Sequence, residues 1–227
     1  YWKNVSPYES EQWLRTNFTD KIKNYLDVEP KNIIDVGCAM GLGTRFIKSA
    51  FNDSKVTGLD LSPYFLGVAK YLNKNMEFIH ANAEEIPLED NTVDLITLQY
   101  LFHEVPTIPS QKILDEVYRV LKPGGSIAII DLDPKRVLEG LESNVFRKWA
   151  FEVTEPHIYE YYNSNMNRML YSSGFIKTKR EINDPLNSVW LGTKPLYEKK
   201  ELSIRENSNY LKEKENQSKN KQEFCLV

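Results

Sequence analysis

The chain has 227 residues, of which 41% are hydrophobic and 27% charged, so it is long enough for one domain with a sizeable buried core. The formal net charge of −3 argues against a general nucleic-acid-binding surface. Cys38 and Cys225 are far apart, which argues against a disulfide framework and favours a reducing, intracellular compartment. No apolar run approaches the roughly 20 residues that a membrane-spanning helix needs.

The first 29 residues are predicted to form a helical flap. Apolar side chains recur every three or four residues from Trp13 to Leu26, which predicts an amphipathic helix that ends before Pro30. Because this helix precedes the first predicted strand, it either closes over a ligand site or only packs on the sheet. The pattern leaves both interpretations open.

A short apolar run followed by glycines organises the next segment. Residues 33–36 read as a buried strand, and Gly37, Gly41 and Gly43 follow within seven residues. A helical pattern begins at Thr44. Strand, glycine turn and helix form the first half of a nucleotide-binding βαβ unit, although this glycine spacing alone is weak evidence.

The second predicted strand, residues 55–60, ends in an acidic residue. Asp60 lies about 20 residues beyond the glycine turn, where a carboxylate can accept hydrogen bonds from both hydroxyl groups of a ribose. The turn and the acid together predict a cofactor of the nucleotide type.

Strands and helices then alternate, which predicts an α/β fold with a Rossmann-like, doubly wound and mostly parallel sheet. Two more segments, after Gly174 and at 188–193, flank a turn at 183–185 and predict an antiparallel hairpin that completes a seven-stranded sheet. The remaining predicted strands are residues 76–81, 92–98 and 126–131, with helices from Pro63 and over 109–121.

Residues 133–173 interrupt the alternation with two helical patterns, 145–153 and 158–170. Helices inserted after the fifth strand are expected to lie over the carboxyl ends of the strands, where open α/β sheets bind ligands. The predicted domain therefore spans 30–197. Residues 198–227 are polar and predict a solvated helix or a flexible tail, or alternatively a contact segment for a protein partner.

Five further segments occur in order along the chain: DVGCAMG at 35–41, GLDLS at 58–62, NAEEIP at 82–87, VDLI at 93–96 and LKPGG at 121–125. Together they resemble the class I S-adenosylmethionine-dependent methyltransferases, and within them the small-molecule enzymes of the ubiquinone/menaquinone type. Residues 154–162 and 183–185 resemble plastid proteins of that group, so a plastid is one expected location, with any targeting peptide upstream of Tyr1.

The resemblance implies S-adenosyl-L-methionine as the cofactor. The turn at Gly37, Ala39 and Gly41 would let the backbone approach the methionine part, and Asp35 would hold that turn or a water near the cofactor amine. Ala39 departs from the family pattern, which often has glycine there. Alanine is small, so binding is expected to survive.

Five further residues would hold the rest of the cofactor. By the same resemblance, Asp60 would take the ribose hydroxyl groups and Leu61 would flank the adenine. Asn82 and Ala83 would meet the adenine edge, although the family often has aspartate at the first of these positions. Gln99 would lie near the sulfonium.

The expected reaction is methyl transfer to a small-molecule acceptor. His103 is the candidate base if the acceptor must lose a proton, and the alternative is a hydrogen-bonded structural histidine. His157, Tyr159 and Tyr162 are candidates for an acceptor pocket, or else they pack in the core. No local cluster has the spacing of metal ligands, so the sequence predicts no metal site.

The alternative function is a non-catalytic scaffold or assembly subunit that keeps the fold. The nearly intact cofactor motifs, including Asp60 and Gly41, favour the enzyme. An RNA methyltransferase is disfavoured by the slight acidity of the chain and by the absence of an appended basic segment.

Overall fold

The computed structural model describes residues 11–142 and 145–196. Contacts divide the chain into residues 1–195 and 196–227, and the elements below all belong to the first unit. The predicted polar tail and its proposed contacts lie outside the described residues. Among the described residues, no helix combines the length and the apolarity needed to cross a membrane.

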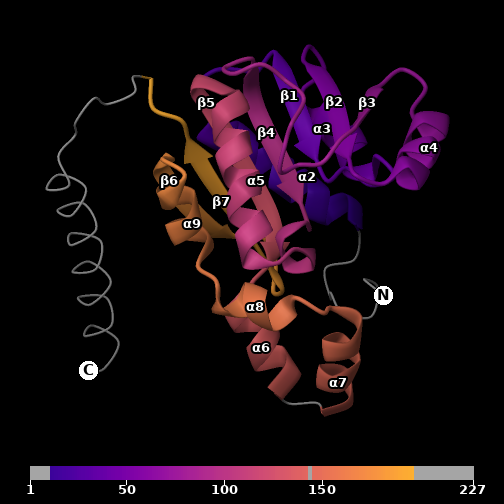
Figure 1. Cartoon of the computed structure of the whole chain (residues 1–227), viewed down its shortest axis with the longest axis vertical. Coiled ribbons are helices and arrows are strands. Elements are labelled where there is room, and N and C mark those ends of the chain that lie inside the picture. Colours follow the sequence, from indigo (N-terminus) through magenta and orange to yellow (C-terminus); the bar gives the residue numbers. More distant parts are fainter. Residues whose placement is uncertain (1–10, 143–144, 197–227) are drawn as a thin grey trace, which may run out of the picture. The chain divides into compact units, whose positions relative to one another are not determined.

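A mixed seven-stranded sheet in the order β3-β2-β1-β4-β5-β7-β6 forms the centre of the fold (Figure 1). The first five strands pair in parallel, while β7 runs antiparallel to both β5 and β6, which confirms the predicted doubly wound sheet with a terminal hairpin. The strands are β1 Asn32–Val36, β2 Lys55–Asp60, β3 Glu77–His80, β4 Val93–Gln99, β5 Leu121–Leu132, β6 Ile176–Ile182 and β7 Asn187–Thr193.

Helices cover both faces of the sheet, so its central strands are buried on two sides. In Figure 1, α5 and α9 lie in front of the sheet and α2 and α3 behind it. Successive residues of β1 therefore enter different cores: Ile33 packs with α2 and α3, and Ile34 packs with α5 and α9. These helices are α2 Glu11–Tyr25, α3 Leu42–Ala50, α4 Pro63–Leu72, α5 Thr107–Val120 and α9 Met166–Ser172.

The N-terminal helix α2 packs on the sheet through Leu14, Phe18 and Ile22, which are all buried. Arg15, on the same helix, reaches Gln99 at the carboxyl end of β4. The helix thus both packs and borders the strand ends, while its role as a flap stays a prediction.

The inserted segment contains more helices than the sequence pattern predicted. The predicted helix over 158–170 is two helices, because Ser164 is extended and the side chain of Asn165 caps a new helix by accepting from the Arg168 N–H. A further helix begins at Pro134, where Asp133 Oδ1 accepts from the Arg136 N–H at 3.2 Å. The inserted helices are α6 Pro134–Glu142, α7 Val145–Thr154 and α8 Ile158–Asn163, followed by α9.

The strand β5 also starts earlier than predicted, at Leu121 rather than Ser126. Gly124, near its start, has a φ angle of 81°, and the pairing with β4 shifts register between Val93 and Leu95. The segment that the sequence marks only as a helix stop is therefore also the irregular start of a strand.

Lys194 ties the end of β7 to the end of α5. Its side chain is buried, and Nζ donates to the carbonyl oxygens of Tyr118 at 2.8 Å and Leu121 at 2.9 Å and to Asn91 Oδ1 at 2.8 Å. A cation at this position satisfies carbonyl groups that a helix leaves open at its C-terminus.

Replacement of this lysine is expected to destabilise the fold. Lys194→Met leaves buried carbonyl groups without a donor, at a cost of about 1–3 kcal/mol for a buried polar group. Urea unfolding followed by circular dichroism should show a lower midpoint. Lys112→Met, which removes a largely exposed lysine, is the matched control and should change stability by less than about 0.5 kcal/mol. Equal midpoints for the two variants would contradict the role given to Lys194.

Candidate functional site

The turn after β1 adopts an unusual backbone conformation. Three of its residues have positive φ angles, 72° at Gly37, 44° at Ala39 and 76° at Gly41. Glycine adopts this region freely, whereas alanine is strained there. The N–H groups of Gly37 and Cys38 both donate to the carbonyl oxygen of Leu59, so the turn is fixed against β2.

Asp60, at the end of β2, holds the turn from the other side. Its Oδ2 accepts from the Ala39 N–H at 2.7 Å, and its Oδ1 accepts from the Ser62 N–H at 2.8 Å. A carboxylate oxygen has two lone pairs, so each can accept one more hydrogen bond. Leu61, which is 65% exposed, and Met40, which is 49% exposed, present apolar surface beside it, and this combination suits a ribose with its base.

The residues predicted to contact the adenine, Asn82 and Ala83, follow β3, the strand next to β2. The carbonyl oxygen of Asp60 accepts from the Ala81 N–H at 3.1 Å, which brings Asn82 and Ala83 to the end of β2. The side chain of Asn82 accepts from the Glu84 N–H at 3.0 Å and so shapes its own loop.

Asp35 lies at the centre of the site and is buried. Its Oδ1 accepts from Thr97 Oγ1 at 2.7 Å and from Gln99 Nε2 at 3.0 Å, and its Oδ2 accepts from Thr44 Oγ1 at 2.7 Å. Burial raises the pKa of Asp35, and these three hydrogen bonds oppose the shift. The carboxyl group therefore orients Gln99 and anchors the first turn of α3.

Arg15 was not identified from the sequence. Its Nη1 donates to Gln99 Oε1 at 2.6 Å, across 84 positions of the chain. Gly43 makes room for this pair, because a Cβ there would lie 2.5 Å from Gln99 Nε2 and 2.8 Å from Arg15 Nη1. The nine candidate cofactor residues thus lie at or just beyond the carboxyl ends of four adjacent strands, β3, β2, β1 and β4, with a guanidinium group beside them.

His103 lies beyond β4 in a short 3₁₀ helix, η1 Phe102–Glu104, and is buried. Its Nδ1 lies 2.6 Å from Oδ1 of Asp131, a fully buried residue at the end of β5. Asp131 is held in turn by the N–H groups of Phe102 and Leu132. The sequence analysis missed Asp131, because nothing local marks its pairing with a residue 28 positions away.

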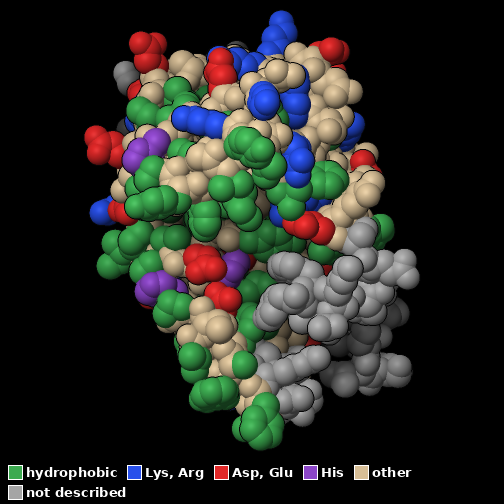
Figure 2. All heavy atoms as spheres, turned by 90° about the vertical axis from the view of Figure 1, so that its right-hand side faces the viewer, with side chains coloured by type: hydrophobic (Ala, Val, Ile, Leu, Met, Phe, Trp, Pro, Cys, Tyr) green, Lys and Arg blue, Asp and Glu red, His purple; other side chains and the backbone are tan. Residues whose placement is uncertain are grey.

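The electrostatic surroundings of His103 are acidic. Burial alone would lower its pKa, but Asp131, Glu104 and Glu155 raise the pKa to about 9. Glu155 comes from the loop between α7 and α8. On the face of the molecule drawn in Figure 2, histidine and acidic side chains lie next to one another, with apolar side chains around them.

The residues predicted for the acceptor pocket separate into two groups. Tyr159 and Tyr162 are among the residues that line a small cavity of about 50 Å³ between the inserted helices. His157 does not line that cavity; it precedes α8, and its carbonyl oxygen accepts from the Tyr161 N–H at 2.9 Å. Tyr161 OH donates to the carbonyl oxygen of Leu132 and so joins α8 to the end of β5.

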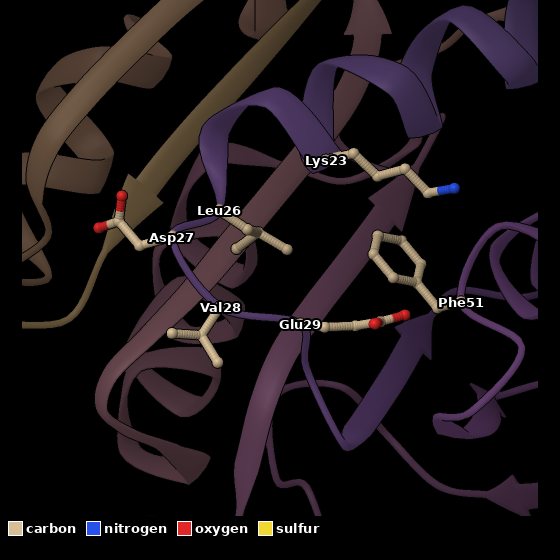
Figure 3. Close-up of a pocket in the computed structure, with 6 residues that line it drawn as sticks. All are labelled: Lys23, Leu26, Asp27, Val28, Glu29 and Phe51. Atoms are coloured by element: carbon tan, nitrogen blue, oxygen red, sulfur yellow. The ribbon is translucent and has the colours of Figure 1, made fainter.

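A larger cavity of about 330 Å³ lies away from these residues (Figure 3). Lys23, Leu26 and the loop before β1 line it, together with Phe51 at the end of α3. This is the amino-terminal end of β1, whereas open α/β sheets bind ligands at the carboxyl ends of their strands. We therefore place the candidate site at the strand ends and not in the larger cavity.

Comparison with known proteins finds both a methyltransferase family model and a methyltransferase relative that are similar to this chain. A family model described as "Methyltransferase domain" matches residues 34–129. The ubiquinone/menaquinone biosynthesis C-methyltransferase of Brucella abortus is 35% identical over 125 residues, which cover 52% of this chain and 45% of that relative. The match thus spans less than half of the relative's own length.

Solved structures share the fold at low sequence identity. A SAM-dependent methyltransferase from Methanosarcina mazei has a TM-score of 0.61 and 22% identity, over 78% of this chain and 98% of the other. The phosphoethanolamine N-methyltransferase 2 of Haemonchus contortus, solved in complex with S-adenosyl-L-methionine, has a TM-score of 0.59 and 17% identity, over 79% of this chain and 52% of the other.

Because the backbone at Ala39 is strained, replacing this alanine by glycine is expected to raise the stability of the fold, whereas such a replacement usually lowers it. Ala39→Gly should stabilise the fold by about 0.5–1 kcal/mol, because glycine adopts a positive φ without the steric cost of a Cβ. Ala150→Gly, at an exposed position inside α7, should instead destabilise it by about 1 kcal/mol. Chemical denaturation measures both variants, and destabilisation by Ala39→Gly would show that the turn is not strained as described.

Proposed function

We propose that this chain, whose residues 34–129 match the methyltransferase-domain family model, is a class I S-adenosylmethionine-dependent methyltransferase that transfers a methyl group from S-adenosylmethionine to a small-molecule acceptor. The observation that carries the proposal is the convergence of the candidate cofactor residues at four adjacent strand ends, directly beside the His103–Asp131 pair.

We assign the nucleoside end of the cofactor to Asp60 and its neighbours. The free lone pairs of this carboxylate are suited to the two ribose hydroxyl groups, and exposed Leu61 offers an apolar face to the adenine. The left-handed turn, from Gly37 to Gly41, would lie under the methionine part. Arg15, held at Gln99 and paired with Glu11, brings a guanidinium group that suits the cofactor's carboxylate.

The bound cofactor would supply an electrophilic methyl group on a sulfonium. What the protein must add is an acceptor held in line and close, since much of the rate of such a transfer comes from positioning. For an acceptor that loses a proton in the step, the neutral form of His103 would take that proton at Nε2, because Nδ1 already faces Asp131. Since the acidic surroundings raise the pKa of His103 to about 9, this form, and the reaction that uses it, should increase as the pH rises toward about 9. Asp131 would act as a positioning residue that fixes the orientation of the ring.

The acceptor is proposed to enter between His103 and the inserted helices. Tyr159 and Tyr162, with the apolar residues of their cavity, would form part of its wall. The relative's name, a C-methyltransferase of ubiquinone/menaquinone biosynthesis, suggests an aromatic ring acceptor with hydroxyl groups. An apolar ring is compatible with such a wall.

Cofactor binding can be tested with the full chain by isothermal titration with S-adenosylmethionine. We expect binding in the micromolar range. Asp60→Asn should weaken it by about tenfold or more, because a hydrogen bond to a charged group contributes about 1.5–3 kcal/mol. Asp53→Asn, an exposed aspartate in the loop after α3, is the matched control and should bind like the wild type. No binding to folded protein at millimolar cofactor would instead favour the non-catalytic scaffold.

The role of His103 needs a separate measurement. Methyl transfer from labelled S-adenosylmethionine to a panel of hydroxylated quinones and phenols should be lost by about 10²–10⁴-fold in His103→Gln, with cofactor affinity unchanged. His157→Gln is the control and should retain activity. Full activity of His103→Gln on an acceptor that the wild type methylates would leave His103 with a structural role only.

A further inference from the structure

Three side chains that the sequence does not associate converge beside the candidate acceptor region. One ligand atom each of His103, Glu104 and Glu155 lies within 4.8 Å of the other two, and His103 Nε2 lies 3.7 Å from Glu104 Oε1. Within the described residues, this is the one group of three histidine, cysteine or acidic side chains with such a spacing. The prediction of no metal site rested on local spacing, which cannot detect a partner 51 positions away.

The histidine is oriented as a metal ligand would be. Its Nδ1 lies 2.6 Å from the fully buried Asp131, and its Nε2 lies 3.7 Å from Glu104 Oε1, where a metal ion would take the place of the Nε2 proton. A carboxylate behind the non-coordinating nitrogen is the usual outer-shell arrangement of metal-binding histidines. Asp131 is itself fixed by two backbone N–H groups, so the ring has little freedom to turn.

The third ligand has an unsatisfied atom. Glu155 Oε2 is shielded from solvent and has no hydrogen-bond partner among the described residues. Glu155 as a whole is only partly buried, but this one oxygen is out of reach of solvent, and a bound cation would satisfy it. Asp131, Glu104 and Glu155 place three carboxyl groups around one imidazole ring, a set of oxygen and nitrogen donors that suits a divalent ion.

We propose that His103, Glu104 and Glu155 bind one divalent first-row transition-metal ion of the Zn²⁺ class. One imidazole nitrogen and two carboxylate oxygens form a three-ligand set with positions left for water or an acceptor oxygen. Mg²⁺ fits less well, because it prefers oxygen ligands alone. Ligand atoms around an ion with bonds of about 2.1 Å lie roughly 3.4 Å apart, so a small rotation of Glu155 completes the set.

Metal binding would have two consequences. Glu155 belongs to the loop between α7 and α8, so the ion would fasten the inserted helices to the end of β4. It would also occupy the Nε2 lone pair, so that His103 could not accept a proton. This second consequence rests on the proposed function, whereas the binding itself does not.

The test uses the full chain with Cys225→Ser, so that this thiol does not compete for the metal. Titration with Zn²⁺ against a chromophoric chelator, without S-adenosylmethionine, should show one site. His103→Gln and Glu155→Gln should each weaken it by about tenfold or more, and Asp131→Asn by about 10–100-fold. Glu139→Gln on α6 and His157→Gln are matched controls and should bind Zn²⁺ like the parent protein.

Three results would overturn the proposal: no Zn²⁺ site in the folded parent protein, equal affinity in Glu155→Gln, or tighter binding of Mg²⁺ than of Zn²⁺. Circular dichroism of each variant separates loss of the site from loss of the fold. Where the parent protein methylates an acceptor that must lose a proton, Zn²⁺ should inhibit it and should spare Glu155→Gln. Failure to bind S-adenosylmethionine would speak against the proposed function alone, and failure to bind Zn²⁺ against the metal site alone.

Discussion

The buried carboxyl group of Asp35 is the interaction on which the rest of the site depends. It joins β1 to Thr97 and Gln99 of β4 and to Thr44 of α3. Through Gln99 the network extends to Arg15 on α2. A carboxyl group out of water must be fully hydrogen-bonded to be tolerated, so these groups cannot move independently of one another. The glycine turn, the end of β4 and the N-terminal helix are therefore held in one arrangement before any ligand binds.

Acidic residues at other strand ends act in the same way on a smaller scale. Asp60 accepts from the backbone of the glycine turn, and Asp131 accepts from the backbone beside η1. Each carboxylate accepts hydrogen bonds from backbone N–H groups of a neighbouring loop and so fixes that loop. At the same edge of the sheet, each also presents either a carboxylate oxygen or a side chain that it holds. Asp131 does so through His103. Because parallel strands end at one edge, these local arrangements add up to one preorganised surface.

The sequence predicts the parts of the fold that depend on local pattern. Apolar runs, the glycine turn and the acid of Asp60 indicated the strands and a mostly parallel sheet, which the structure confirms, whereas the order of the strands in the sheet was not predicted. The sequence could not predict contacts between residues that are far apart in the chain, such as Arg15 with Gln99 or Glu155 with His103, because no periodicity links them. The unpredicted helix α6 is a different case, since Asp133 followed by a proline is a recognisable helix start.

The strand ends held by Asp35 and Asp60 are proposed to form the methyl-donor site. A crystal structure of the full chain with S-adenosylhomocysteine would test this assignment. We expect the ribose hydroxyl groups within hydrogen-bonding distance of Asp60 and the amino-acid end between the glycine turn and Gln99. Density for the ligand in the cavity beside Lys23 and Phe51, with the strand ends empty, would contradict it.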